Sequence, residues 1–262
     1  MEVDYYKKLF QTIGNIIVLI EKDDIPKYLL FLENAFPYMD NYNYHKGMKE
    51  IIQELKVLLK TKSIGTDSDR ALLLDFQATL ETKPEKAIKL EKDALAQIEN
   101  ITADNARLVS NLHANLGGLY RMNGYPDLAR EHMEKSISLL DQFNLLHIND
   151  SIPQIANYAM FLTEQQEPER GISELQKLSG IIKEYHSDDC LDYAKVQETL
   201  GTIYLMTANL PQAKTHFKRA FKIYEKIWAD EPEMIEAKYR EIQELYPQIG
   251  FSIGKTLSGL LT

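Results

Sequence analysis

Residues 194–227 read AKVQETLGTIYLMTANLPQAKTHFKRAFKIYEKI, and this stretch decides the fold. Its first half places Leu200, Gly201 and Tyr204 on one stripe of a helix. After a breaker at 209–211, the second half places small and aromatic residues on a facing stripe of a second helix: Ala213, Phe217 and Ala220. Since Gly201 has no side chain, the two helices can approach closely there, and the pattern predicts a helical hairpin.

The pattern recurs at a fixed spacing along the chain. Pro84, Pro126 and Pro168 each follow the last by 42 residues, so residues 42 apart occupy equivalent positions. Two other sets keep the same spacing: Leu74, Leu116, Tyr158 and Leu200, and Ala87, Ala129, Gly171 and Ala213. A fixed period in this range is typical of a solenoid built from one supersecondary unit, which usually holds a partner.

Three further copies of the pattern lie before residues 194–227 in the chain, at 110–143, 152–185 and 68–101. The copy at 68–101 has Asp75 where glycine is expected. Set beside the pattern W-x2-L-G-x2-Y…A-x3-F, residues 194–227 match all but the first position. The chain thus resembles the tetratricopeptide repeat (TPR) family. Its long repeats look like those of kinesin light chains and of bacterial intracellular peptide-pheromone receptors. The resemblance implies an all-α fold, a right-handed α-solenoid of TPR-type hairpins.

Both ends are expected to cap this solenoid. Helices are predicted over 2–21, 26–38 and 44–61, and the last two form a degenerate repeat in which Leu32 and Phe36 lie 42 residues before Leu74 and Ala78. Two more are predicted over 231–246 and 250–261. No linker rich in Gly, Ser or Pro divides the chain, so one domain over 1–262 is expected: 1–62 as N-terminal cap and degenerate repeat, 68–227 as the clearer repeats, and 231–262 as C-terminal caps.

The charge and the cysteine content limit the classes of partner and the cellular location to be expected. The chain has 30 Lys and Arg against 39 Asp and Glu, a net charge of −9, which argues against nucleic acid or an anionic membrane as the main partner. A single cysteine, Cys190, allows no internal disulfide and fits a cytoplasmic location. The oligomeric state is left open by the sequence.

The sequence contains only weak matches to nucleotide-binding and metal-binding motifs. Residues 250–256 resemble a phosphate loop, but three residues separate the glycines where four are needed. His186 and Cys190 are four residues apart and could be a metal or thiol pair, yet a loop whose Asp188 or Asp189 caps the next helix explains them better. We therefore expect no catalytic, cofactor-binding or metal-binding residues, and no enzyme activity.

The candidate site is the side of each repeat's first helix opposite its core stripe, because in TPR proteins that side lines a concave groove for peptides. Asn115 and Asn157 occupy equivalent positions, and an asparagine can both donate to and accept from a peptide backbone. The predicted peptide-binding groove consists of Asn111, Asn115, Met122, Asn157, Met160, Thr163, Lys195, Thr199 and Thr202, with Gly118, Leu73 and Phe76 at equivalent positions.

Three functions remain open. The first is a cytoplasmic TPR scaffold that binds a protein or peptide segment in this groove without catalysis. The second is a peptide-responsive regulator similar to the pheromone receptors, with 1–62 as a cap or an effector bundle, and the third is an enzyme on an α-solenoid. Lys214, Lys218, Lys222 and Lys226 form a basic stripe, read either as a solvated face or as a docking patch for an acidic partner.

Overall fold

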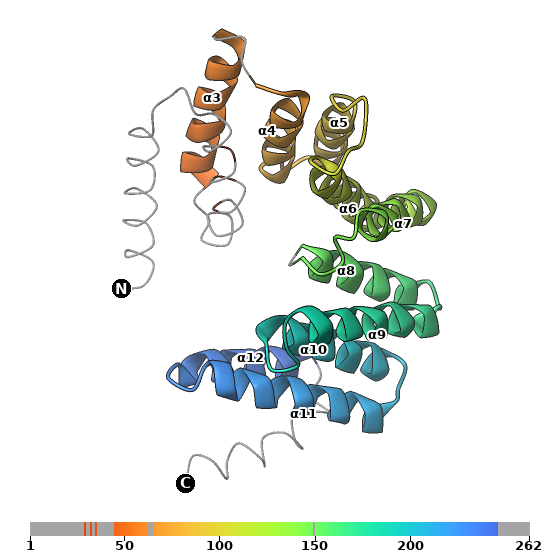
Figure 1. Cartoon of the computed structure of the whole chain (residues 1–262). Coiled ribbons are helices and arrows are strands. Elements are labelled where there is room, and N and C mark those ends of the chain that lie inside the picture. Colours follow the sequence, from red (N-terminus) through yellow and green to blue (C-terminus); the bar gives the residue numbers. More distant parts are fainter. Residues whose placement is uncertain are drawn as a thin grey trace. The chain divides into compact units, whose positions relative to one another are not determined.

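The computed structural model describes residues 29, 32, 35, 45–61, 65–148 and 150–245. Every regular element among them is an α-helix, which confirms the all-α fold class (Figure 1). The helices are α3 (His45–Thr61), α4 (Asp67–Thr79), α5 (Pro84–Leu95), α6 (Ala106–Met122), α7 (Pro126–Gln142), α8 (Ser151–Glu164), α9 (Pro168–Tyr185), α10 (Leu191–Met206), α11 (Leu210–Ile227) and α12 (Pro232–Leu245).

The predicted repeats are helical hairpins. Helix α4 packs on α5, α8 on α9 and α10 on α11. Helix α6 packs on α7, because Gly117 lies against Met133 and His113 bonds His132. Pro84, Pro126 and Pro168 each begin the second helix of a hairpin, where the missing N–H has no partner to lose. The equivalent residue of the last hairpin, Leu210, also begins its second helix, with proline one position later.

In three repeats, the turn between the two helices of the hairpin has a residue with positive φ at the same repeat position. Gly124, Gln166 and Ala208 all have positive φ, at 76°, 65° and 60°. The N–H of the following residue then bonds the carbonyl five positions back, as Glu167 does to Leu162 at 2.8 Å. Glycine supplies this conformation without steric cost in only one of the three turns, so the tertiary contacts of the other two hold it in place.

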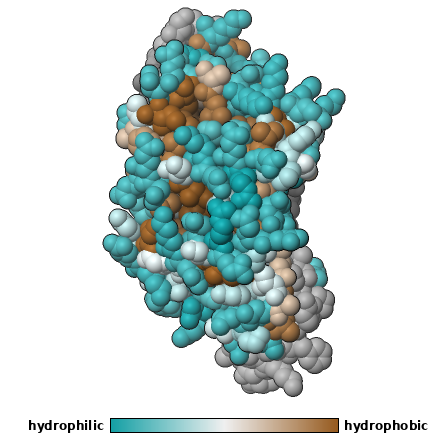
Figure 2. All heavy atoms as spheres, turned by 90° about the vertical axis from the view of Figure 1, so that its right-hand side faces the viewer, coloured by the Kyte–Doolittle hydropathy of each residue, from teal (hydrophilic) through white to brown (hydrophobic). Residues whose placement is uncertain are grey.

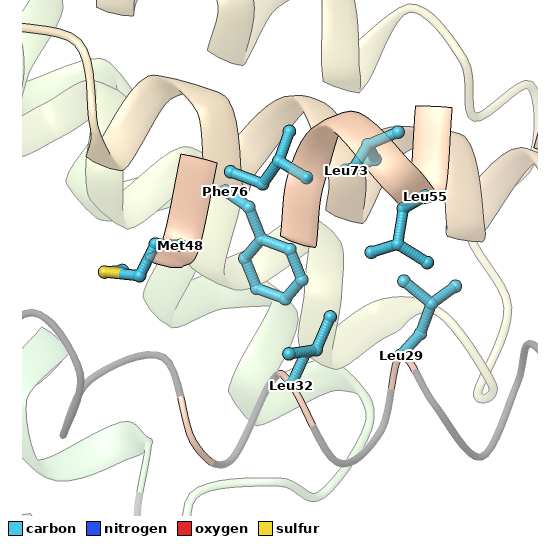
Figure 3. Packing of buried hydrophobic residues seen from close by; sticks show 7 residues of the cluster. Leu29, Leu32, Met48, Leu55, Leu73 and Phe76 are labelled. Atoms are coloured by element: carbon cyan, nitrogen blue, oxygen red, sulfur yellow. The ribbon is translucent and has the colours of Figure 1, made fainter. Parts of the chain in front are cut away.

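The helices group into two compact units that divide between Leu139 and Leu140. In the first unit, Leu29 and Leu32 pack with Met48 and Leu55 of α3 against Leu73 and Phe76 of α4 (Figure 3). In the second unit, the interior of the hairpins holds large side chains that are at most 1% exposed, namely Phe161, Leu162, Leu175, Leu178, Leu200 and Phe217.

The expectations for the two ends are partly covered by the described residues. Helix α3 occupies the predicted 44–61 segment, and Leu32 is fully buried. Helix α12 occupies most of 231–246 and buries Ile242. The predicted helices 2–21 and 250–261, the phosphate-loop resemblance at 250–256 and Phe36 lie outside the described residues.

One helix cap differs from the predicted one, and a second was not predicted. Thr66 caps α4: its Oγ1 accepts from the N–H of Asp69, whose carboxylate accepts from the N–H of Thr66 in return. Cys190, and not Asp188 or Asp189, caps α10, because its Sγ accepts from the N–H of Tyr193 at 3.4 Å. This contact accounts for Cys190 without a metal.

Candidate functional site

In the first unit the candidate face is occupied by an acidic cluster. Asn115 of α6 donates through Nδ2 to Asp75 of α4 at 2.8 Å and to Glu91 of α5 at 3.3 Å. Helices α4 and α6 are the first helices of successive hairpins, so this bond joins two repeats. Because both hydrogens of the Asn115 amide are donated inward, this side chain offers a partner its carbonyl oxygen, an acceptor only.

The cluster replaces an apolar contact that the other hairpins keep. Glu91 lies at the position equivalent to Met133, Leu175 and Phe217, all large core side chains. Asp75 lies at the position equivalent to Gly117, Ala159 and Gly201. A Cβ added at Gly117 would lie 2.5 Å from Cγ of Met133, and one at Gly201 would lie 3.0 Å from the Phe217 ring, so these two positions face each other across the hairpin.

Burial governs the charge of this cluster. Glu91 is only 2% exposed. Burial, then the negative charge of Asp75 and the hydrogen bond to it, raise the pKa of Glu91 to about 10, while the Asn115 amide acts in the opposite direction. Burial and the charge of Asp75 therefore both favour the protonated form of the Glu91 carboxyl group.

In the second unit, three predicted residues lie on α8. Asn157 is exposed, and its amide side chain makes no hydrogen bond within the described part of the chain. Met160 and Thr163 are half-buried, and Thr163 donates its hydroxyl to the carbonyl of Ala159 four residues earlier, at 2.9 Å. Asn157 thus keeps both its donors and its acceptor available to a partner.

The other three lie on α10. Thr199 and Thr202 are half-buried, and each donates its hydroxyl to a carbonyl of its own helix, at 3.0 and 3.1 Å. Lys195 is exposed and pairs with Asp192 at 3.6 Å, a contact of little energetic weight on a surface. The two threonines therefore present oxygen lone pairs, which suits a partner that brings N–H donors.

The remaining predicted residues, Asn111 and Met122, lie on α6. The prediction that Leu73 and Phe76 line the groove is wrong. Asn111 is half-buried and Met122, the last residue of α6, is 85% exposed. Leu73 and Phe76 do not line a groove: they are 6% and 3% exposed, because α3 and the segment at 29 and 32 cover this face of α4 (Figure 3). Repeat position alone does not predict exposure at Leu73 and Phe76, because α3, Leu29 and Leu32 cover these two side chains.

Sequence reasoning also missed a polar contact that two hairpins share. His113 and His132 bond through their Nδ1 atoms at 2.8 Å, and at the equivalent positions Gln197 Oε1 bonds His216 Nδ1 at 2.9 Å. Both second-helix histidines stack on the tyrosine of their own hairpin, Tyr120 or Tyr204, with ring centres 5.4 and 5.2 Å apart. The signal was a tyrosine followed by histidine twelve residues later, found twice at a spacing of two repeats.

A metal site and a membrane span find no support in the described residues. No group of three or more His, Cys, Asp or Glu side chains is placed there to hold a metal ion, and His186 Nε2 contacts the carbonyl oxygen of His147. Within the same described ranges, no helix is both long and apolar enough to cross a membrane. One face of the molecule shows mainly hydrophilic side chains, with separate hydrophobic patches among them (Figure 2).

Comparison with known proteins identifies the repeats. Residues 151–226 match the tetratricopeptide repeat family. The crystal structure of BtubC (BKLC) from P. vanneervenii matches with a TM-score of 0.61 at 18% identity, covering 79% of this chain and 83% of that one. A Podosopora anserina structure described as a kinesin light chain with nearly identical TPR-like repeats matches with a TM-score of 0.57 at 13% identity, covering 75% and 96%.

These matches confirm the TPR resemblance and the helical-repeat solenoid. At such low identity the two structures show the fold alone. A comparison of the sequence with curated proteins finds no match.

Proposed function

We propose that this protein is a cytoplasmic interaction scaffold that binds a peptide or protein segment along the first helices of its repeats, without catalysis. TPR repeats typically bind protein partners, and the family match over 151–226 is the observation that carries the proposal. The net charge of −9 further favours a protein over a nucleic acid or an anionic membrane.

The described side chains suggest which chemistry the segment brings. On α10, Thr199 and Thr202 donate their hydroxyl hydrogens to carbonyl groups of the same helix, so their hydroxyl oxygens can accept from a partner. On α8, Asn157 offers both donors and an acceptor, and Met160 beside it adapts to side chains of different shape. An extended segment whose backbone N–H groups face these oxygens fits the arrangement, with Asn157 as the bidentate contact.

Selection from a phage-displayed library of short random peptides tests the proposal. Peptides selected on the wild-type protein are measured by titration calorimetry against Asn157→Ala and against Gln176→Ala, which removes an exposed amide from α9, the second helix of the same repeat. We expect Asn157→Ala to weaken binding by about 1–3 kcal/mol and Gln176→Ala to change nothing. Equal affinities for both variants would place the binding surface elsewhere, with the lysine stripe of α11 as the next candidate.

A further inference from the structure

A cavity of about 380 Å³ opens in the first unit between α3, the end of α4 and α5. These helices are neighbours in space, since α3 packs on α4 and α4 packs on α5 (Figure 1). The volume falls within the range of pockets that hold small molecules, roughly 300–1,000 Å³. None of the residues predicted for the peptide groove lines this cavity, so it is a separate place in the fold.

The α3 wall of the cavity carries a cation at each end and an apolar side chain between them. Lys49, Ile52 and Lys56 line the cavity, and their spacing of three and then four residues places them on one face of the helix. The two lysines are two helical turns apart, about 10 Å along the axis. Ile52 lies between them and is 5% exposed.

The two lysines have no anionic partner. Both are exposed, and neither makes an ion pair or a hydrogen bond within the part of the chain that the structure describes. Among the lining residues the acid is Glu81, whose carboxylate accepts from the backbone N–H of Lys83 at 3.1 Å. The cavity thus has a surplus of positive charge in a chain whose net charge is −9, and it attracts anions.

The other side of the cavity is apolar with two polar groups. Leu80 and Leu90 are half-buried, and Leu80 packs against the core cluster that contains Ile52. The amide of Gln77 is held in place, because its Nε2 donates to a carbonyl of its own helix at 2.8 Å. Thr82 is exposed in the turn after α4 and adds a hydroxyl group. A ligand in this cavity therefore meets apolar side chains along its middle.

We propose that this cavity binds a small organic dianion whose two charged groups are joined by an apolar chain. One charged group pairs with Lys49 and the other with Lys56, while the chain lies against Ile52 and Leu80. A linear dicarboxylate of about eight carbons has the length for this, because the lysines are two helical turns apart. Each carboxylate makes a charge-assisted hydrogen bond to a lysine, and burial of the chain adds hydrophobic free energy. This ligand is distinct from the peptide of the proposed function.

Titration calorimetry of the full chain at low ionic strength tests the proposal with three probes. Octanedioate has two carboxylates and the long chain, octanoate has one carboxylate on the same chain, and succinate has two carboxylates on a short chain. We expect octanedioate to bind about tenfold more tightly than either of the others, because each of them lacks one contact. Octanoate or succinate bound as tightly as octanedioate, or no binding of octanedioate, would overturn the proposal.

Charge-removing variants locate the binding. Lys49→Gln and Lys56→Gln each remove one charge from the cavity, and Lys46→Gln is the matched control. Lys46 lies on the same helix, its side chain is 92% exposed, and it does not line the cavity. We expect each cavity variant to weaken octanedioate binding about tenfold and the control to leave it unchanged. Equal losses in all three variants would show a response to net charge alone and would overturn the proposal.

Two further measurements complete the test. Far-UV circular dichroism of the three lysine variants should match the wild type, because each substitution lies on the surface. Asn157→Ala, which tests the proposed peptide site, should bind octanedioate as the wild type does. The two proposals therefore fail independently, and a loss of octanedioate binding in Asn157→Ala would place the anion outside the cavity.

Discussion

Residues 68–101 and 194–227 hold opposite chemistry at the same two repeat positions. In the later repeat, the Phe217 ring fills the space that Gly201 leaves open, and Phe217 is fully buried. In the earlier repeat, Asp75 and Glu91 occupy those positions and are bonded by Asn115. The hairpin therefore forms around either an apolar contact or a polar one.

The carboxyl groups of Glu198 on α10 and Glu91 on α5 differ in the same way. Glu198 of α10 accepts from Tyr224 Oη at 2.6 Å and contacts Lys238 Nζ of α12 at 2.8 Å. Burial first, and then the charge of Glu198, raise the pKa of Tyr224. Glu198 thus has a cation and a hydroxyl beside its carboxyl group, whereas Glu91 lies beside the carboxyl group of Asp75 and accepts from the Asn115 amide.

The largest expected effect separates the two repeats directly. Phe217→Ala removes a fully buried ring and should lower the free energy of unfolding by about 3–5 kcal/mol. Glu91→Ala at the equivalent position should cost far less, because it also removes a buried acid. Urea unfolding of both variants at neutral pH measures the difference, and equal losses would show that the two positions are not energetically distinct.

Conversion of the polar contact into an apolar one is the next largest change. Asp75→Ala combined with Glu91→Leu installs the pair that Ala159 and Leu175 form in another hairpin. Replacing a buried ionisable pair by packed hydrophobic residues should leave the free energy of unfolding unchanged or raise it by about 1–4 kcal/mol. The gain should grow with pH, because the raised pKa of Glu91 makes the wild type alone lose this contribution to stability as the pH rises. A strongly destabilised double variant would mean that the acids are required for the fold.

The close approach of α8 and α9 at Gly171 predicts a smaller loss of stability. A Cβ at Gly171 of α9 would lie 2.7 Å from the backbone oxygen of Ala159 on α8, and this atom cannot turn away. Gly171→Ala should therefore push the helices apart and cost about 1–3 kcal/mol. Gly180 on the same helix has open space around its Cβ position, so Gly180→Ala should stabilise by about 0.4–1 kcal/mol. Thermal unfolding that ranks the two variants the other way would contradict the packing.

The smallest expected effect is a loss of stability at low pH, caused by protonation of His113. The Nδ1 atoms of His113 and His132 bond only when one donates and the other accepts, so the accepting ring must be neutral. Burial first, then His132 and Lys135, lower the pKa of His113 from 6.5 to about 4. Its contribution is complete above pH 6.5 and is lost as the pH falls toward 4.

His113→Gln installs the residue found at the equivalent position 197 and removes this titration. We expect the wild-type melting temperature to fall more steeply than that of His113→Gln between about pH 7 and about pH 5. Identical slopes for the two proteins would show that His113 titrates normally in the folded state.

The sequence by itself determined the repeat. A period of 42 residues, prolines at the start of second helices and a small residue opposite a large one are local features, and local spacing dictates which side chains share a helix face. The hairpins α4–α5, α6–α7, α8–α9 and α10–α11 and the buried stripe around Leu200 and Phe217 followed from them.

Contacts between helices far apart in sequence were decided only by the tertiary structure. Whether a helix face is open depends on what packs on it, so Leu73 and Phe76 are core residues although their repeat positions predicted a groove. The charge of Glu91 depends on its burial and on Asp75 and Asn115, which are 16 and 24 residues away in the chain. A carboxyl group reads as ionised in a sequence, and only its surroundings reveal that its pKa is raised.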